Sequence, residues 1–480
     1  MTMMTLEVAS VGAYAPRYRL PADAVEEAWG RSHGAGISET AVPAADEDAL
    51  TMAAEAATLA LSEGDLEPAE VSRLLLATTT PPLEEGAVAA RLASFLGCDE
   101  TVETRTFPAG TRAGVDALAT GLEGDGPTLV VASDAPRGAP DDEVEHAGGA
   151  GAAAVLLTAD GGGSIRDRAE RTTATPGTRF RPAGSDETTG LGIAPYDRSA
   201  FVDGVAAVAD ALEYDPGDAD AVALQSPNGK LPYRAAGPLG VETDAIRDGT
   251  TVHDLGDTGA ASPLLGFASA LEAGHESVIL IGYGSDGAAA VALEVGNIAV
   301  ATRLEGAETL SYGEYLRTRG DITPGEPDGG GAYVSVPSWT RTLPQRHRLV
   351  AGRCRECGDL AFPPEGACPG CSAFEAYDEV TLPGTGTVEA ATVIGQGGAP
   401  PEFVEQQARE GAYVSAIVAL DGPAVEDGRD GSAATVSTPA QVRTVGDESV
   451  SPGDRVEATI RRIYTQEGVT RYGFKMRLLE

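Results

Sequence analysis

The sequence predicts a layered α/β fold over roughly its first 340 residues and a small all-β barrel near its C-terminus. Short apolar runs alternate with Ala-rich helical stretches, which is the pattern of sheets covered by helices. This alternation pauses in an irregular segment at 163–200 and then starts again. Past residue 378 the apolar runs become short alternating strands separated by Gly and Pro turns, which is typical of a β-barrel.

The first α/β half is predicted at residues 1–165. It contains one long helical stretch, DALTMAAEAATLALSEG at 48–64. The strands expected around that helix are LEVASVGAY at 6–14, SRLLLATTT at 72–80, GPTLVVASD at 126–134 and GAAAVLLTAD at 151–160.

The second half, at 166–317, repeats this order of elements and therefore predicts a duplicated core rather than two unrelated domains. Its expected helices are FVDGVAAVADALEYD at 201–215 and ASPLLGFASALEAG at 261–274. Its expected strands are DAVALQS at 220–226, SVILIGYG at 277–284 and AAAVALEV at 288–295. A Pro- and Gly-rich linker is predicted at 318–345, a metal-binding ribbon at 346–378 and the barrel at 379–480.

The charge of the chain is strongly negative along its whole length. Acidic residues number 73 against 34 basic ones, which gives a net charge of −39, and Lys230 and Lys475 are the only lysines. We interpret this as a surface adapted to molar salt, as in haloarchaea, where a screening length of about 3 Å makes such repulsion tolerable. Binding to a nucleic-acid backbone is disfavoured, because it needs a cationic surface.

The sequence also predicts a cytoplasmic protein without a membrane partner. No run of 18 or more apolar residues occurs, and the N-terminal residues MTMMTLEVAS lack a basic region followed by an apolar one.

Four of the five cysteines fall in CRECGDLAFPPEGACPGC at 354–371. Two C-x-x-C pairs at this spacing predict a tetrahedral site of four thiolates, which suits a structural zinc ion, although iron is chemically possible. Disulfides or free thiols are the alternatives. Cys98 lies outside this cluster and is interpreted as a packed thiol. The predicted metal ligands are Cys354, Cys357, Cys368 and Cys371.

Several segments together resemble a known family. VASVGAYAPRYRLPADAVEEAWG, DEDALTMAAEAA, GAPDDEVEHAGGAGAAAVLL and QSPNGKLPYRAAGPLG are similar to segments of archaeal 3-hydroxy-3-methylglutaryl-CoA (HMG-CoA) synthases of the thiolase superfamily, over residues 5–315. Residues 346–480 resemble the zinc-ribbon and OB-fold proteins that accompany thiolases. The resemblance implies a thiolase-type αβαβα core, followed by a zinc ribbon and an OB barrel.

The resemblance also implies a catalytic site, in which four family positions carry other residues here. Thr111, in TRAGVDAL, stands where the family has its nucleophilic Cys, and Thr79 stands where it has a catalytic Glu. Gln225 replaces a His, and Asp257 replaces the Asn that binds the thioester. Thr is a poor nucleophile without a neighbouring base, and neither Thr79 nor Gln225 is one.

The family's P-N-G-K loop is retained, which implies a site for CoA or acyl-CoA. Lys230 is the residue whose family counterpart lies near the CoA phosphates, and Asn228 and Gly229 complete the loop. Two clusters of basic residues are interpreted as ion pairs with the chain's own carboxylates, or as docking sites for CoA phosphates or an acidic partner. They are Arg166, Arg168, Arg171, Arg179 and Arg181, and Arg341, Arg346, Arg348, Arg353 and Arg355.

These observations predict a catalytically degenerate HMG-CoA synthase-like protein that binds acyl-CoA, a thiolase subunit, or both, as an organising or channelling subunit. A first alternative is an active carbon–carbon bond enzyme, such as an aldolase, that uses His146, His253 or Asp254. A second alternative is a true synthase-type acyltransferase. The resemblance further implies a homo-oligomer, at least a dimer.

Overall fold

A computed structural model of the chain falls into two compact units, Met1–Tyr315 and Leu316–Glu480, which are described separately. None of its described helices is long and apolar enough to cross a membrane. The described residues are 5–108, 110–296, 298–323, 336–374, 377–395, 399–400, 403–423, 435–466 and 468–479.

The first unit contains the same four-stranded arrangement twice. In both halves the second and third strands are parallel, whereas the third and fourth, and the fourth and first, are antiparallel. This repeat of strand order and direction confirms the predicted duplication. The first set is β1 (Glu7–Tyr14), β4 (Arg73–Ala77), β6 (Thr128–Asp134) and β7 (Gly151–Thr158), and the second is β8 (Gly163–Thr172), β9 (Ala221–Leu224), β10 (Ser277–Gly284) and β11 (Gly287–Val295).

The two sets join through a single pair of residues, Val8 in β1 and Gly163 in β8. Strand β5 (Glu103–Phe107) extends the first set beside β4, and β12 (Ala299–Arg303) pairs with β1 in parallel.

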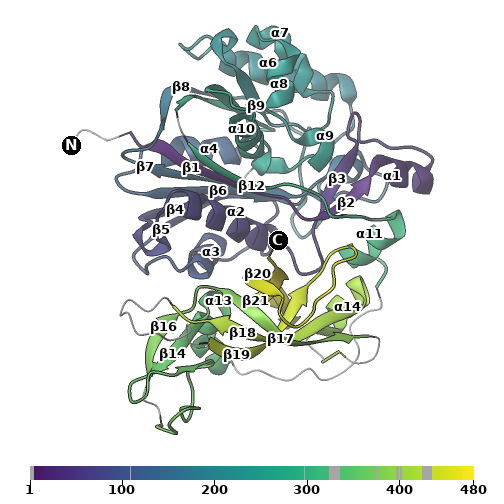
Figure 1. The fold of residues 1–480 in the computed structure, drawn as a ribbon. Coiled ribbons are helices and arrows are strands. Elements are labelled where there is room, and N and C mark those ends of the chain that lie inside the picture. The colour runs from purple at the N-terminus through teal and green to yellow at the C-terminus, as the bar shows by residue number, and fades with distance from the viewer. Residues whose placement is uncertain are drawn as a thin grey trace. The chain divides into compact units, whose positions relative to one another are not determined.

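Helices form three layers around these two sheets (Figure 1). Helix α2 (Ala49–Glu63) packs on β1, β6 and β7, and α6 (Ala194–Ala209) packs on β8, β10 and β11. Between the sheets, α4 (Ala113–Gly121) and α10 (Ser262–Glu272) contact each other and strands of both halves. The order helix, sheet, helix pair, sheet, helix is the predicted αβαβα layering.

Shorter elements complete the first unit. A small sheet contains β2 (Tyr18–Pro21), β3 (Glu39–Val42) and β13 (Glu308–Thr309). The remaining helices are α1 (Ala22–Trp29), α3 (Val88–Leu96), α5 (Glu143–Ala147), α7 (Ala236–Leu239), α8 (Thr243–Asp248), α9 (Val252–Leu255) and α11 (Tyr312–Arg319), the last of which runs into the second unit. Single 3₁₀ turns occur at Pro68–Glu70, Pro216–Asp218, Pro232–Ala235 and Gly259–Ala261.

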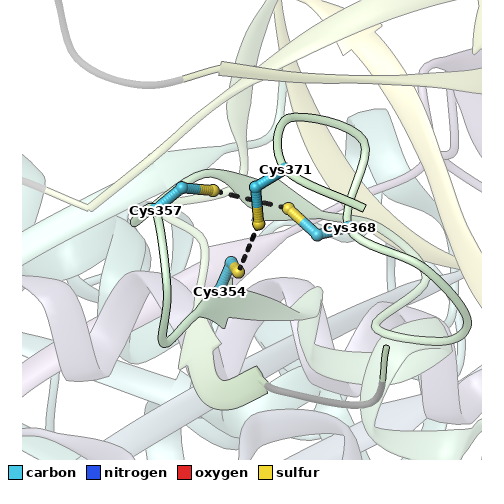
Figure 2. A group of neighbouring side chains, drawn as sticks. All are labelled: Cys354, Cys357, Cys368 and Cys371. Carbon is cyan, nitrogen blue, oxygen red and sulfur yellow. Dashed lines mark hydrogen bonds between the residues drawn. The ribbon is translucent and has the colours of Figure 1, made fainter. Parts of the chain in front are cut away.

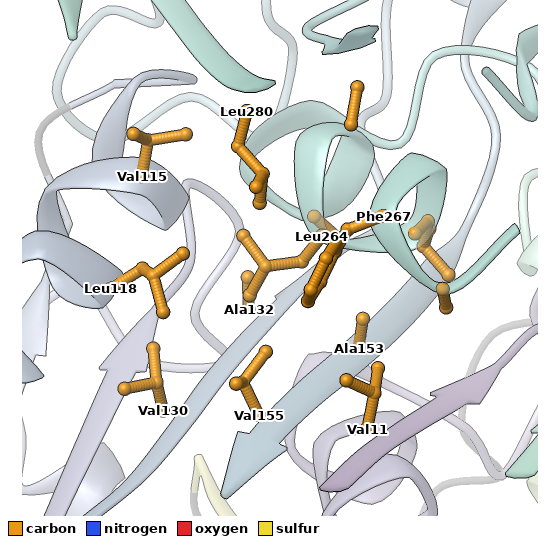
Figure 3. Packing of buried hydrophobic residues seen from close by; sticks show 14 of the residues in the cluster. Val11, Val115, Leu118, Val130, Ala132, Ala153, Val155, Leu264, Phe267 and Leu280 are labelled. Carbon is orange, nitrogen blue, oxygen red and sulfur yellow. The ribbon is translucent and has the colours of Figure 1, made fainter. Parts of the chain in front are cut away.

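The central helices are held by a close-packed apolar core (Figure 3). Val115 and Leu118 of α4 lie beside Leu264 and Phe267 of α10, and all four side chains are excluded from solvent. Full burial of a side chain of this size contributes roughly 1.5–3 kcal/mol. At Gly114 the backbone of α4 also comes close to Ala260 in the turn before α10.

The second unit contains a small ribbon sheet and a closed barrel. The ribbon consists of β14 (Val350–Cys354) between β15 (Leu360–Ala361) and β16 (Tyr377–Thr381). The predicted barrel is confirmed as a closed five-stranded one, in the order β17-β18-β19-β21-β20. The narrower OB-fold assignment stays a prediction. The barrel strands are β17 (Thr385–Ile394), β18 (Tyr413–Asp421), β19 (Thr435–Arg443), β20 (Arg455–Gln466) and β21 (Val469–Leu478).

Helix α14 (Val404–Glu410) is joined to the barrel by charged and polar contacts. Arg443 of β19 holds Glu410 with two hydrogen bonds of 2.6 and 3.2 Å, and the buried Lys475 donates to Gln406 at 2.7 Å.

The predicted linker at 318–345 is partly helical. Residues 324–335 lie outside the described residues. On their C-terminal side the chain forms α12 (Val336–Arg341) and α13 (Leu343–Arg348), so the Pro and Gly content did not indicate these two helices.

The close approach of α4 to the start of α10 predicts opposite effects for two Gly-to-Ala substitutions in helices. A Cβ at Gly114 would lie 2.1 Å from the carbonyl oxygen of Ala260, whereas a Cβ at Gly313 in α11 would meet no atom within 4 Å. Gly114→Ala should destabilise the protein by about 1–3 kcal/mol through overpacking. Gly313→Ala should be neutral or stabilise it by up to about 1 kcal/mol. Calorimetric unfolding in molar salt measures both, and equal effects would contradict the packing described.

Candidate functional site

Thr111 lies just before α4 and is buried against the second half of the core. Its side chain is 3% exposed, and its Oγ1 donates a hydrogen bond of 2.5 Å to the carbonyl oxygen of Tyr283 in β10. A carbonyl oxygen can only accept, so the hydroxyl proton is committed to it. No hydrogen bond joins Thr111 to the other three family positions among the described residues.

Asp257 and Gln225 lie together. Gln225 follows β9 and Asp257 follows α9, and the Gln225 Nε2 approaches Asp257 Oδ1 at 3.4 Å. The same oxygen accepts the backbone N–H of Gly259 at 2.9 Å. The other oxygen, Oδ2, is paired with the guanidinium of Arg179. Asp257 is 2% exposed, so this is a buried carboxylate whose charge is balanced by one arginine.

Thr79 contacts a carboxylate that the sequence did not single out, Asp134 at the end of β6. The Thr79 amide donates to Oδ1 of Asp134 at 2.6 Å and its hydroxyl to Oδ2 at 2.9 Å. The backbone N–H of Ala260 donates to Oδ2 at 2.7 Å. Further donors to Asp134 are the Thr78 hydroxyl and both the amide and the hydroxyl of Thr80.

Burial raises the pKa of Asp134 above its usual value, while the N–H of Ala260 and the hydroxyls of Thr80 and Thr79 oppose that rise. Asp134 therefore joins the loop after β4 to the turn before α10. The one feature of the sequence that could have indicated this role is the position of Asp134 at the end of the apolar strand TLVVASD.

Arg179 and Arg181 both reach the family positions from the irregular segment between β8 and α6. Arg179 pairs with Asp257, and Arg181 donates to the carbonyl oxygen of Thr79. Sequence reasoning had placed both only in a basic cluster.

The interpretation of the basic clusters as ion pairs with the chain's own carboxylates is confirmed for five of their members. The pairs are Arg166–Glu294, Arg168–Glu123, Arg179–Asp257, Arg341–Glu365 and Arg355–Asp378.

The loop at 228–230 is a tight turn against the segment before β3. Asn228 Oδ1 accepts the backbone N–H groups of Lys230 and Leu231, at 3.0 and 2.9 Å. A Cβ at Gly229 would lie 2.2 Å from the carbonyl oxygen of Gly36, so only glycine fits there. Lys230 is exposed, and the described residues provide no hydrogen bond or ion pair for its ammonium group. An exposed, unpaired cation on a rigid turn is suited to binding a phosphate.

The ring nitrogens of two histidines considered for an alternative mechanism are all engaged. His146 accepts the backbone N–H of His33 at Nδ1 and contacts the carbonyl oxygen of Pro140 through Nε2, at 3.1 and 3.2 Å. Burial lowers the pKa of His146. His33, Asp141 and His146 bring potential metal-ligand atoms within 4.8 Å of one another, but the contacts of His146 leave it no free lone pair.

His253 is engaged in the same way. Its Nδ1 donates to the carbonyl oxygen of Gly36 at 2.6 Å, and its Nε2 accepts the hydroxyl of Tyr233 at 2.7 Å. Neither histidine is therefore free to act as a base without losing a contact. Asp254 lies beside His253 in α9.

The four clustered cysteines converge as predicted (Figure 2). The Sγ atoms of Cys354 and Cys371 lie 3.6 Å apart, those of Cys357 and Cys368 lie 3.5 Å apart, and all four lie within 4.8 Å of one another. A tetrahedral site with zinc–sulfur bonds of about 2.3 Å places its sulfurs about 3.8 Å apart. The residues therefore fit a structural zinc ion, and four thiolates leave no position for water.

Local structure around the cysteines supports such a site. A backbone N–H of Cys357 lowers the pKa of Cys354 to about 7, whereas burial and the neighbouring thiols outweigh the N–H of Asp359 and raise the pKa of Cys357 to about 12. Gly358 directly after the first pair adopts a left-handed conformation with φ +83°. By contrast, burial raises the pKa of Cys98 to about 11, in agreement with its interpretation as a packed thiol.

Comparisons with known proteins agree with both units. The family described as "ChsH2, rubredoxin-like zinc ribbon domain" matches residues 341–375. The hydroxymethylglutaryl-CoA synthase of Methanopyrus kandleri is 29% identical over 343 residues, which cover 66% of this chain and 95% of that protein. Other archaeal hydroxymethylglutaryl-CoA synthases are similar to this chain, such as that of Methanosarcina acetivorans, which is 29% identical over 56% of this chain and 81% of that protein.

Solved structures confirm the thiolase-type fold of the α/β core. An HMG-CoA synthase complexed with CoA superposes with a TM-score of 0.58 at 18% identity, over 69% of this chain and 94% of that one. The 3-oxoacyl-(acyl carrier protein) synthase III of Pseudomonas aeruginosa PAO1 gives a TM-score of 0.53 at 24% identity, over 61% and 99%.

The convergence of the cysteines predicts close to one zinc ion per chain. Cys357→Ala should remove that metal, because three thiolates bind it much more weakly, whereas Cys98→Ala should retain it. Elemental analysis of freshly purified protein measures the metal in all three proteins. A natural chain with almost no metal, or a Cys357→Ala variant with a full equivalent, would exclude the site.

The donors around Asp134 predict that Asp134→Asn destabilises the protein. An amide nitrogen at either carboxylate position would face a donor, such as the N–H of Ala260 or of Thr80, and each unpaired donor costs roughly 1–3 kcal/mol. The expected loss is about 2–4 kcal/mol. Asp160→Asn, which makes the same change at an exposed position, should stay within about 0.5 kcal/mol of the natural chain. Similar denaturation midpoints for the two variants would contradict this account.

Proposed function

We propose that this chain is a degenerate HMG-CoA synthase-like protein that binds acyl-CoA and organises or channels intermediates, alone or with a thiolase subunit. The observation that carries this proposal is the state of Thr111. Its hydroxyl is buried and donates to a backbone carbonyl, and no base among the described residues is hydrogen-bonded to it. A hydroxyl in this state is not activated for attack on a thioester.

The other three family positions support the same conclusion. The acid/base position is Thr79, which donates to Asp134, and the histidine position is Gln225, which has no basic atom. The Asn position is Asp257, whose carboxylate is an acceptor where an oxyanion needs donors. Four such changes together remove the nucleophile, the acid/base groups and the amide donor.

A CoA site can remain after this chemistry is lost. The turn at 228–230 is held rigidly and presents the charge of Lys230 to solvent. An HMG-CoA synthase of the same fold has been solved with CoA, which supports CoA as the ligand. The ribbon and barrel unit would then serve as the docking module for a partner subunit, with the synthase-like unit as a dimer. Co-purification with an intact thiolase would test this arrangement.

A true synthase-type acyltransferase is the second candidate. The observation in its favour is the similarity to proteins named as synthases. The match spans 95% of the hydroxymethylglutaryl-CoA synthase of Methanopyrus kandleri. The two candidates differ in whether a covalent acyl-enzyme forms on this chain.

The state of Thr111 predicts that no acetyl-enzyme forms. Neither the natural chain nor Thr111→Cys should gain an acetyl group from acetyl-CoA, because restoring one member of a catalytic group leaves the others missing. Loss of an oxyanion donor costs about 10²–10³ in rate, and loss of acid/base groups costs about 10²–10⁴ more. Mass spectrometry after incubation with labelled acetyl-CoA is the measurement. A stable adduct on Thr111 of the natural chain would favour the acyltransferase.

The exposed charge of Lys230 predicts CoA-dependent stabilisation. CoA should raise the melting temperature of the natural chain by mass action. Lys230→Ala should reduce that shift, because it removes the positive charge near the phosphate. Lys230→Arg should largely keep the shift, because arginine is also positively charged. Equal shifts in all three proteins would show that the loop does not contact CoA, and no shift in any of them would exclude a CoA site.

A further inference from the structure

Residues 33–37, between α1 and β3, form a turn that supports the loop at 228–230. The Gly229 amide donates a hydrogen bond of 2.9 Å to the carbonyl oxygen of Ala35. Gly36 packs directly on Gly229, and a Cβ on either glycine would meet the backbone of the other at 3.0 Å or less. The position of the loop therefore depends on the position of this turn.

The turn is held by the ring of His146 in α5. The amide of His33 donates to Nδ1 of His146 at 3.1 Å, and a Cβ at Gly34 would lie 2.4 Å from the carbonyl oxygen of His146. Nε2 of the same ring lies 3.2 Å from the carbonyl oxygen of Pro140. Because a carbonyl oxygen can only accept, Nε2 carries the proton of the ring and Nδ1 carries none. The contact with His33 therefore exists only while His146 is neutral.

Charged and titratable groups surround this ring. The ring of His33 stacks on that of His146 with centroids 5.3 Å apart, and Nε2 of His33 lies 3.7 Å from Asp141, which also pairs with Arg31. The hydroxyl of Tyr312 in α11 donates at 3.5 Å to the carbonyl oxygen that Nε2 contacts. Burial lowers the pKa of His146, and His33 and Arg31 lower it further, whereas the backbone hydrogen bond of the ring and Asp141 oppose this.

The other titratable groups near the turn keep their contacts when the pH falls. His253 donates from Nδ1 to the carbonyl oxygen of Gly36, and a charged ring retains that proton. The carboxylate of Glu145, beside His146 in α5, accepts the hydroxyl of Tyr315. Among these groups, His146 is the one whose protonation removes a contact of the turn.

We propose that His146 is a proton-sensitive latch of the CoA site, whose protonation releases the turn at 33–37 and lowers the affinity for CoA. This inference rests on the proposed binding of CoA at Lys230. A proton added at Nδ1 points at the N–H of His33, so that two donors face each other and the contact is lost. Because the ordered turn binds one proton fewer than the released turn, its order is lost as the pH falls below about 6.5, the ordinary pKa of a histidine.

Calorimetric titration of the full chain with CoA in molar salt tests the latch, at about pH 7.5 and about pH 5. In His146→Asn the side-chain oxygen replaces Nδ1 as the acceptor and does not titrate in this range. On acidification the natural chain should lose roughly three- to tenfold more affinity than His146→Asn. A variant is the reference because a CoA phosphate also takes up a proton near about pH 6. His275 contacts Asp248 instead of the turn, so His275→Asn should respond as the natural chain does.

A second measurement needs neither a variant nor a ligand. Amide hydrogen exchange within 33–37, corrected for its intrinsic dependence on pH, should show lost protection on acidification, while α2 keeps its protection. An equal loss of CoA affinity in the natural chain and His146→Asn would overturn the latch, as would unchanged protection of the turn at about pH 5. If CoA does not bind at about pH 7.5, the proposed function fails, and the effect of His146 on CoA fails with it.

Discussion

The geometry of the candidate site depends on the contact between α4 and the turn that begins α10, in the layer between the two sheets. At Gly114 the helix backbone comes so close to the carbonyl oxygen of Ala260 that no side chain fits between them. Thr111 precedes α4, and Asp257 and Gly259 precede α10. Because both helices are fixed by the apolar core, the segments before them are fixed as well. Residues about 150 positions apart in the sequence thereby reach one place.

Asp134 and Asp257 show how this place is stabilised by polar contacts. Each is a buried carboxylate that would be costly without partners. Asp134 accepts from backbone and threonine donors on two loops, and Asp257 accepts from Arg179 and the amide of Gly259. These polar groups bind one another, and the site is thereby ordered.

The ribbon depends on a different constraint. It pairs strands of only five, two and five residues and has little apolar core of its own, a size at which proteins usually need a metal or disulfides. Four converging thiolates supply that stabilisation when a metal joins them. The geometry of the ribbon therefore rests on side-chain chemistry, whereas the synthase-like unit rests on apolar packing.

The sequence by itself determined the features that depend on local spacing or on pattern. The two C-x-x-C pairs specify the cysteine cluster, because each pair turns two sulfurs toward one point, and the repeated order of apolar runs specifies the duplicated core. The turn at 228–230 could also be located, since its residues are consecutive. The role of Asp134 could not, because its donors come from the loop after β4 and the turn before α10. The sequence also could not predict that Arg179 pairs with Asp257, 78 residues later. The hydrogen bonds of the His146 and His253 rings could not be predicted either. Only the tertiary packing decides these contacts, because a side chain's partner is set by the distance between elements and not by position in the sequence.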